Sequence, residues 1–273
     1  MASLARFEKY EGLGNDFVVI DAGSEGELSE ERARALCDRR RGVGADGVLL
    51  LLPPRVAEAT ARMRVVNADG SIAEMCGNGL RCAALHLARA RGVSHGDLAI
   101  ETDAGVRACA IDRSGDAAVV VCDMGMIRVQ DDVVVDLGAE RVALTRADAG
   151  NPHAVALRAF TPGDLAQLGP QLAAAPVFFA RGGVNIELAQ RVAGVLDVVV
   201  GERGAGATLA CGTGACAAVA VARAKGVVSG EGSVRVRLPG GELEVGLDPR
   251  TGRTTLRGPA RHVFSGDLPG EAT

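Results

Sequence analysis

Two cysteines each stand directly before a glycine-rich turn. The two segments are Cys76-Gly77-Asn78-Gly79 and Cys211-Gly212-Thr213-Gly214. Each turn leads into an alanine-rich stretch with helical composition, so each thiol is expected to face the N-terminus of a helix. The helix dipole and the backbone N–H groups there stabilise a thiolate, so we expect both thiol pKa values to fall from ~8.5 toward neutrality. The same N–H groups can hold a substrate carboxylate.

The two cysteine segments are part of an internal repeat. They are separated by an offset of 135 residues, from Cys76 to Cys211, and three further pairs of segments follow at offsets of 134 to 136. These pairs are residues 14–15 with 150–151, 82–93 with 216–227, and 101–108 with 237–244. Four features in the same order at one spacing indicate a duplicated domain, because a solenoid would show more and shorter copies.

A duplicated pair of thiols predicts one kind of reaction. If the two copies are related by a pseudo-twofold axis, Cys76 and Cys211 face each other across one cleft. One thiolate can then remove a proton from a carbon atom while the opposing thiol delivers a proton to the other face. The chemistry that suits this arrangement is inversion of a stereocentre. The remaining cysteines are expected to be small buried hydrophobic side chains; they are Cys37, Cys82, Cys109, Cys122 and Cys216.

The elements that must position these residues indicate an α/β (α+β) fold. Apolar and β-branched runs predict strands at residues 17–21, 48–52, 63–67, 98–102 and 106–111. Helices are predicted at residues 80–91 and 215–225, and a surface helix at residues 27–40. Because the first two helices are apolar nearly all round, each is expected to be a buried central helix with strands packed on every side.

The repeat divides the chain into two pseudo-symmetric domains. We expect the first to span residues 1–122 and the second residues 123–259, with the linker between the copies near residues 123–141. The tail, residues 260–273, is expected to pack on the first domain.

Composition narrows the class of protein. The chain has 273 residues, 48% of them hydrophobic, and a net charge of −4, which excludes a disordered chain and disfavours nucleic acid or a membrane surface as a partner. The sequence contains neither a membrane span nor the apolar core of a signal peptide, so we expect a cytoplasmic protein. Seven cysteines, an odd number, argue against a disulfide framework, and their spacing predicts no metal site.

The repeat also aligns other polar groups. Asn67 lies nine residues before Cys76, and Glu202 lies nine before Cys211; His153 takes the place of Phe17. His153 and Glu202 are therefore candidates to tune the thiols or relay protons, although a loop histidine and a solvated surface pair are the plainer interpretations. The amides near turns are either simple turn residues or uncharged groups suited to a zwitterionic substrate; they are Asn15, Asn78, Asn151 and Asn185.

Five segments closely resemble diaminopimelate epimerases. They are residues 7–17, 67–71, 75–82, 150–153 and 202–214. The resemblance implies two similar α/β halves, each a sheet wrapped round a central helix, with the active site between them. It implies cofactor-independent interconversion of LL- and meso-diaminopimelate for lysine and peptidoglycan synthesis, by a homodimer.

The resemblance also assigns residues. Cys76 and Cys211 would be the two acid/base groups, and His153 and Glu202 would assist the proton transfers. The positions that match substrate contacts are Asn15, Asn67, Asn151, Asn185, Glu202 and Arg203, and those that match carboxylate-holding helix openings are Gly77, Asn78, Gly212 and Thr213. The chain departs from the family at Gly47, where some relatives have a glutamine that contacts substrate.

Three other interpretations compete with this one. A proline-racemase-like enzyme would use the same fold and opposed cysteines, but the sequence around Asn78 and Glu202 favours a diaminopimelate epimerase. A pyridoxal-phosphate racemase needs a Schiff-base lysine, and the chain offers only Lys9 and Lys225. A thiol-based redox or metal sensor is the non-enzymatic alternative.

Overall fold

The computed structural model describes residues 6–23, 28–161, 163–179, 182–204, 206–228, 232–248 and 250–268. These residues form two compact units. Unit 1 consists of the described parts of residues 1–122 and 258–273, and unit 2 of the described parts of residues 123–257. The chain passes from one unit to the other within β8 (Ala117–Met126) and again within β17 (Arg253–Asp267).

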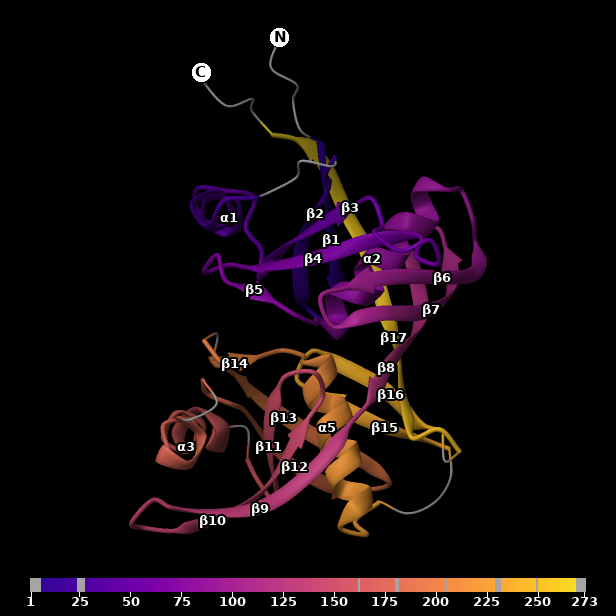
Figure 1. Cartoon of the computed structure of the whole chain (residues 1–273). Coiled ribbons are helices and arrows are strands. Elements are labelled where there is room, and N and C mark those ends of the chain that lie inside the picture. Colours follow the sequence, from indigo (N-terminus) through magenta and orange to yellow (C-terminus); the bar gives the residue numbers. More distant parts are fainter. Residues whose placement is uncertain are drawn as a thin grey trace. The chain divides into compact units, whose positions relative to one another are not determined.

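Each unit has its own strands and helices (Figure 1). Unit 1 contains β1 (Arg6–Gly12), β2 (Asn15–Asp21), α1 (Glu30–Cys37), β3 (Gly47–Leu52), β4 (Ala61–Asn67), β5 (Ile72–Ala73), α2 (Gly77–Ala90), β6 (His95–Thr102), β7 (Gly105–Ser114) and most of β8. Unit 2 contains β9 (Arg128–Asp136), β10 (Arg141–Asp148), β11 (Pro152–Leu157), α3 (Asp164–Ala173), α4 (Pro176–Phe179), β12 (Asn185–Val192), β13 (Val195–Glu202), β14 (Gly206–Thr208), α5 (Gly212–Ala224), β15 (Ser233–Leu238) and β16 (Gly241–Leu247).

The two units share one strand topology, which confirms the predicted duplication. In unit 1, β2 pairs parallel with β3, β3 antiparallel with β4, and β4 parallel with β6. In unit 2, β11 pairs parallel with β12, β12 antiparallel with β13, and β13 parallel with β15. The registers also correspond, since Phe17 lies opposite Gly47 in unit 1 and His153 lies opposite Asn185 in unit 2.

A central helix lies among the strands of each unit (Figure 1). Strands β1, β2, β3, β4, β6 and β7 contact α2, and β9, β10, β11, β12, β13, β15 and β16 contact α5. Helix α5 meets these strands with small side chains such as Ala215, Ala217 and Ala218, which have no exposed surface, whereas α2 also buries the larger Leu80 and Leu85. The expectation of buried central helices is confirmed.

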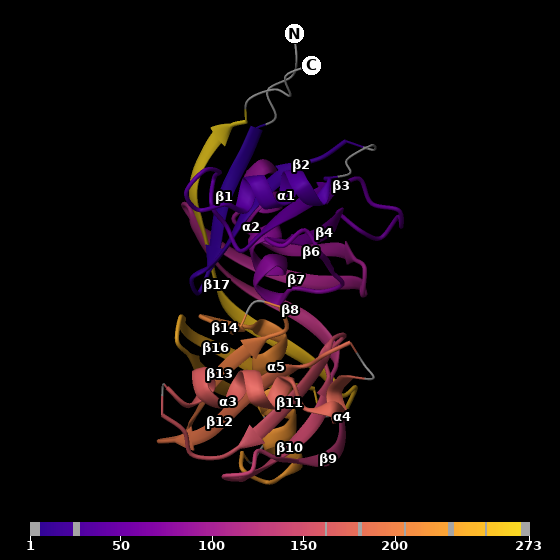
Figure 2. The same cartoon turned by 90° about the vertical axis from the view of Figure 1, so that its left-hand side faces the viewer.

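The other helices cover the outer faces of the sheets, and in Figure 2 α1 and α3 lie in front of the strands of their units. Helix α1 packs on β3 and β4, and its N-cap Ser29 accepts a hydrogen bond from the Arg32 N–H at 3.1 Å. Helix α3 packs on β12 and β13 over an apolar core that includes Leu172 and Ile186. Each unit is therefore layered, with a helix inside the sheet and a helix outside it.

Two sequence-based boundaries need correction. Residues 123–141 are not a loose linker, because β8 ends at Met126 and β9 occupies Arg128–Asp136. The valines of β9, three of them consecutive, pair with β10, so this segment is part of the sheet of unit 2. The central helices also begin three residues earlier than predicted, at Gly77 and Gly212. For the surface helix, the predicted start Glu27 lies outside the described residues, and α1 ends at Cys37.

Replacement of Leu172 by alanine tests the outer core of unit 2. The side chain is fully buried, so we expect Leu172→Ala to lower the free energy of unfolding by about 2–5 kcal/mol. Val177→Ala in α4, where the side chain is 42% exposed, should cost less than about 0.5 kcal/mol. Urea unfolding of both variants measures the difference, and equal losses would contradict the assigned packing.

Candidate active site

Each central helix is capped by a cysteine at its N-terminus. Cys76 has an extended backbone, and its Sγ accepts the Gly79 N–H of the first turn of α2 at 3.3 Å. Cys211 caps α5 in the same way, and its Sγ accepts the Gly214 N–H at 3.4 Å. The two thiols therefore occupy equivalent N-cap positions in the two units, where the helix dipole favours negative charge.

The expectation of a depressed pKa is wrong for Cys211. The residue is only 5% exposed, and burial raises the pKa of its thiol well above the ordinary value. The nearby carboxylate of Glu202 raises this pKa further, while the Thr213 hydroxyl and the Gly214 N–H oppose the shift. At neutral pH Cys211 is therefore a protonated thiol in this state. The sequence revealed the helix terminus but not the depth of burial.

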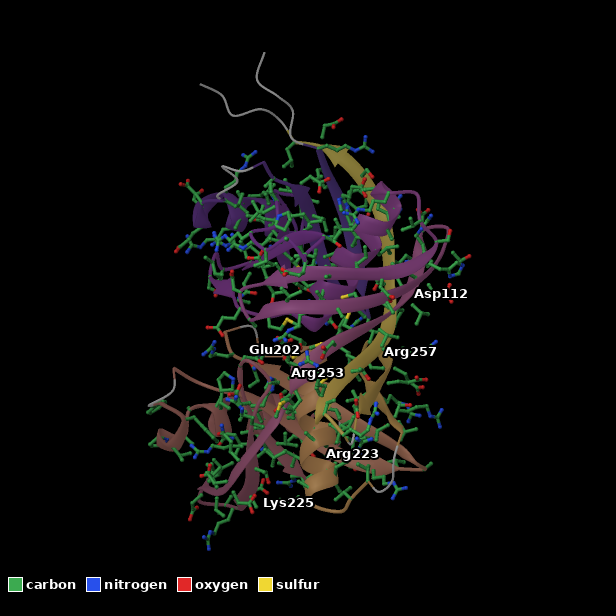
Figure 3. The ribbon with its side chains drawn as sticks, turned by 45° about the vertical axis from the view of Figure 1, so that its right-hand side comes forward. Asp112, Glu202, Arg223, Lys225, Arg253 and Arg257 are labelled. Carbon is green, nitrogen blue, oxygen red and sulfur yellow. The ribbon has the colours of Figure 1, made fainter. Side chains whose placement is uncertain are left out.

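Glu202 ends β13 beside the N-terminus of α5. Figure 3 places it at the end of α5 opposite to Arg223 and Lys225. Its Oε1 accepts a hydrogen bond from the Thr208 hydroxyl at 2.7 Å, which holds the carboxylate in place. Because its charge acts on the pKa of Cys211, the predicted association of Glu202 with a thiol is present within unit 2.

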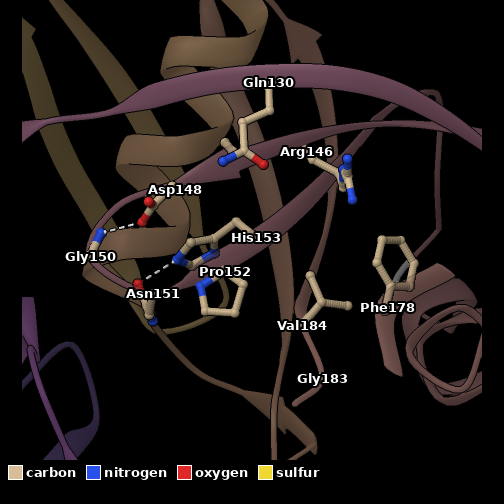
Figure 4. A pocket seen from close by; sticks show the side chains of 11 residues that line it. Gln130, Arg146, Asp148, Gly150, Asn151, Pro152, His153, Phe178, Gly183 and Val184 are labelled. Atoms are coloured by element: carbon tan, nitrogen blue, oxygen red, sulfur yellow. Dashed lines mark hydrogen bonds between the residues drawn. The ribbon is translucent and has the colours of Figure 1, made fainter. Parts of the chain in front are cut away.

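His153 lies in a chain of buried polar groups. Its Nε2 is 2.9 Å from Asn151 Oδ1 (Figure 4). Its Nδ1 is 2.6 Å from Glu187 Oε1. The side chains of His153 and Glu187 have no exposed surface. The plainer interpretation of His153 as a satisfied loop histidine is wrong about the loop, because His153 lies in β11, but the ring is buried and bonded on both edges.

A hydrogen bond joins the Asn185 side chain to the backbone of Arg203, and both side chains also bond to nearby carbonyl groups. The Arg203 N–H donates to Asn185 Oδ1 at 2.9 Å, and the Asn185 amide donates to the Pro152 carbonyl at 3.1 Å. The Arg203 guanidinium donates to the Gly182 carbonyl at 3.1 Å. Unit 2 thus brings together the predicted residues Asn151, His153 and Asn185 at the adjoining ends of β11 and β12.

Unit 1 brings together Asn15 and Asn78. The Asn78 amide donates to Asn15 Oδ1 at 3.1 Å, and the Asn15 amide donates to Asp46 Oδ2 at 2.8 Å. The fully buried Arg81 donates to Asn78 Oδ1 at 2.9 Å and to the Pro259 carbonyl at 3.0 Å. These contacts fix the two amides beside the first turn of α2, so they are more than turn residues.

Asn67 and Gly47 lie directly opposite each other in the β3–β4 pair. The Asn67 amide donates to Ser71 Oγ at 3.0 Å across its own turn. A Cβ atom at Gly47 would meet the Val66 carbonyl oxygen at 2.9 Å and the Phe17 ring at 3.6 Å. Any side chain at this position would therefore have to displace the Val66 backbone, whereas the Phe17 ring is at an ordinary contact distance, and this accounts for the glycine in this chain.

A cavity of about 230 Å³ opens beside His153 in unit 2. Figure 4 shows Asn151, Gln130 and Arg146 around the ring, with Phe178 on the far side. The complete lining is Gln130, Arg146, Ala147, Asp148, Gly150, Asn151, Pro152, His153, Phe178, Gly183 and Val184. The wall is thus polar where the predicted site residues lie and apolar toward α4.

Sequence reasoning missed three residues that hold the site. Asp46 anchors Asn15, Arg81 anchors Asn78, and Glu187 bonds His153. Glu187 is the clearest omission, because it lies two residues after Asn185 in a strand that is otherwise apolar at that point. A lone acidic residue within an apolar strand is the signal that could have identified it.

Two kinds of feature are absent from the residues that the structure describes. No group of three or more His, Cys, Asp or Glu side chains in that part of the chain could hold a metal ion. Among the helices in the described ranges, none is long and apolar enough to cross a membrane.

The chain is built from two similar halves, each with a cysteine at the start of its central helix. A family model for diaminopimelate epimerase matches residues 7–129 and 145–263. The chain belongs to the diaminopimelate epimerase family. The resemblance, the fold class and the assignment as an isomerase are confirmed.

Curated relatives match nearly the whole chain. A diaminopimelate epimerase of Thermosynechococcus vestitus is 41% identical over 288 residues, covering 96% of this chain and 99% of the relative. One of Desulforudis audaxviator is 42% identical over 279 residues, covering 95% and 98%.

Solved structures share the fold at lower identity. A probable proline racemase from Agrobacterium radiobacter has a TM-score of 0.76 at 19% identity, covering 97% of this chain and 93% of its own. A hydroxyproline epimerase from Agrobacterium vitis has a TM-score of 0.78 at 16% identity, covering 98% and 94%.

Alkylation should distinguish the two capping thiols. Cys76 is partly exposed, whereas the other six cysteines are buried, so iodoacetamide at pH 7.5 should label Cys76 first. Because its pKa is raised, Cys211 should gain reactivity about tenfold per pH unit as the pH increases. Burial also raises the pKa of Cys37, to about 11, which makes it a slow internal control. Peptide mass spectrometry measures the rates. Labelling of Cys211 as fast as Cys76 at pH 7.5 would contradict the assignment.

Proposed function

We propose that this chain interconverts LL- and meso-diaminopimelate by proton transfer at the α-carbon, without a cofactor, in lysine and peptidoglycan precursor synthesis. The observation that carries the proposal is the pair of cysteines at equivalent N-cap positions, in a chain about 41% identical to diaminopimelate epimerases over nearly its full length. A two-base inversion needs two such groups, and the duplicated fold supplies one in each unit.

Cys76 and Cys211 are the two proton-transfer groups in this proposal. A thiolate at one position takes the α-proton, so the C–H bond breaks, an S–H bond forms, and the electron pair moves onto the substrate carboxylate. The thiol at the other position then gives its proton to the opposite face of the carbon. Cys211 is protonated at neutral pH and therefore begins as the proton donor. The transfer leaves Cys76 protonated and Cys211 ionised, which is the state that accepts the other isomer.

The helix openings stabilise the intermediate. The first-turn N–H groups of a helix have no intrahelical partners and point toward a bound anion. Gly77 and Asn78 open α2, and Gly212 and Thr213 open α5, so these N–H groups can hold the α-carboxylate as negative charge develops on it. Fixed donors of this kind lower the barrier because they need no reorganisation during the reaction.

The remaining polar groups suit a substrate with two amino-acid ends. Amides bind carboxylate and ammonium groups without adding charge, and this role falls to Asn15, Asn67, Asn151 and Asn185. The Arg203 guanidinium can bind the distal carboxylate, and Glu202 can bind an ammonium group. His153 and Glu202 assist the proton transfers at the thiols. Membership of the family also supports a cytoplasmic location and a homodimer as the active form. Sedimentation analysis would test the homodimer.

A proline-racemase-like activity is the alternative. The structural neighbours of that type are only 16% and 19% identical to this chain, so their likeness concerns the fold. The curated relatives near 41% identity favour diaminopimelate, and purified protein assayed with both substrates would decide between the two activities.

Removal of either capping thiol should abolish epimerisation. We expect Cys76→Ala and Cys211→Ala each to lower kcat by about 10²–10⁴-fold, the usual contribution of a general acid or base. Cys216→Ala removes a thiol buried within α5, away from the cap, and should leave kcat within about threefold. The assay follows the conversion of LL-diaminopimelate into the meso isomer by NMR. Turnover retained in either capping variant would refute the two-thiol mechanism.

Glu202→Gln should change the chemistry more than the binding. Removal of the negative charge lowers the pKa of the Cys211 thiol, because Glu202 disfavours the thiolate. We therefore expect a Cys211 labelling profile displaced to lower pH, and a lower kcat because the carboxylate that assists the proton transfers is lost. A change confined to KM would assign Glu202 to substrate recognition alone.

A further inference from the structure

The two units differ at one buried pair of positions. On β2 and β3 of unit 1, Phe17 lies opposite Gly47, and Leu49 follows two residues later. On β11 and β12 of unit 2, His153 lies opposite Asn185, and Glu187 follows two residues later. An apolar pair, Phe17 and Leu49, therefore corresponds to an ionisable pair in the other half.

The fold itself does not require the ionisable pair. Phe17 and Leu49 are 3% and 0% exposed, so an apolar pair fills the same position well. Two desolvated ionisable side chains commonly stabilise a protein no more than apolar residues of similar size. The difference between the units is thus better explained by chemistry than by stability.

Glu187 is hydrogen-bonded to the His153 ring and to the backbone of Ala154. Its Oε1 is 2.6 Å from His153 Nδ1, and its Oε2 has no hydrogen-bond partner among the described residues. The carboxyl group lies against the first turn of α5, where a Cβ atom at Gly214 would come within 2.9 Å of Oε1. Glu187 does not line the cavity, whereas His153 does. Gly214, in the Cys211 motif, therefore also leaves room for the Glu187 carboxyl group, because it has no Cβ atom.

The hydrogen bonds indicate which atoms of His153 and Glu187 carry protons. Asn151 Oδ1 is an acceptor, so His153 Nε2 at 2.9 Å carries a proton and donates it. The 2.6 Å contact between Nδ1 and Oε1 needs one further proton, shared by the ring and the carboxyl group. Burial and the charge of Glu202 raise the pKa of Glu187, which favours the form with that proton on the carboxyl oxygen. Cys211 is the other titratable group near this carboxyl.

We propose that Glu187 is a positioning residue that fixes the Nε2–H tautomer of His153 and supplies a proton to Nδ1 when the ring gives up its Nε2 proton. This inference rests on the proposed function. When a thiolate in the active site accepts the Nε2 proton, the Nε2–H bond breaks and an S–H bond forms. The Glu187 proton moves from Oε1 to Nδ1, so the imidazole stays neutral and Glu187 becomes a carboxylate. Return of a proton to Nε2 reverses both movements.

Glu187→Gln separates this role from a structural one. Glutamine has nearly the same shape and can donate to Nδ1, so it preserves the tautomer and the packing, but it cannot release its proton. We expect kcat to fall at least tenfold, with KM within threefold and the melting temperature within about 2 °C of the parent protein. Glu242→Gln, on an exposed salt bridge with Arg237 in the same unit, is the matched control and should match the parent in all three. Full kcat in Glu187→Gln would overturn the proposal.

A second variant transfers the apolar pair of unit 1 into unit 2. The double replacement of His153→Phe and Glu187→Leu should melt at or above the temperature of the parent protein while losing at least a hundredfold in kcat. A large loss of stability would instead show that the ionisable pair is structural and would overturn the proposal, as would full activity.

NMR of the ligand-free protein gives a readout independent of turnover. The imidazole ¹⁵N signals of His153 should show a protonated Nε2 and a shared, strongly downfield Nδ1 proton, which Glu187→Gln removes. An Nδ1 that titrates like a free imidazole would overturn the proposal. If the parent protein does not exchange the α-hydrogen of diaminopimelate, the proposed function fails, and the NMR result still decides the His153–Glu187 pairing.

Discussion

The structure depends on the enclosure of a helix by strands on every side. An enclosed helix has its side chains buried on every side, and its first turn still has N–H groups that need partners. In both units the first partner is a cysteine sulfur, at Cys76 and at Cys211. The burial that forms the core therefore also places a reactive atom at a helix N-terminus. In each half, the packing of the core and the position of the reactive thiol therefore both depend on the burial of the central helix.

The duplicated halves have kept their topology and diverged in their side chains. At equivalent positions, unit 1 has Phe17, Leu49 and Asn67, whereas unit 2 has His153, Glu187 and Glu202. Unit 2 thus concentrates ionisable groups around its thiol, and their charge and burial raise the pKa of Cys211. The two equivalent capping cysteines, Cys76 and Cys211, therefore lie in different electrostatic environments.

Sequence alone predicted the repeat, the capping cysteines and the buried helices, because each is a local pattern of residue types. It could not predict Glu187, whose partner His153 is 34 residues away and meets it only through the β11–β12 pairing. It also could not predict the pKa direction at Cys211, because desolvation depends on how closely strands surround the cap. The segment 123–141 was misassigned since its glycines suggested a linker, although its valines continue the sheet.

Strand β17 has a consequence for how the protein is made. Its end, including Phe264 and Asp267, pairs with β1 at the other end of the chain, whereas the elements of unit 2 come from one continuous stretch. During synthesis on the ribosome, unit 2 can acquire nearly all its strands before the end of β17 emerges, but unit 1 must wait with an open edge until that segment has emerged. The half that is translated first is therefore the half completed last.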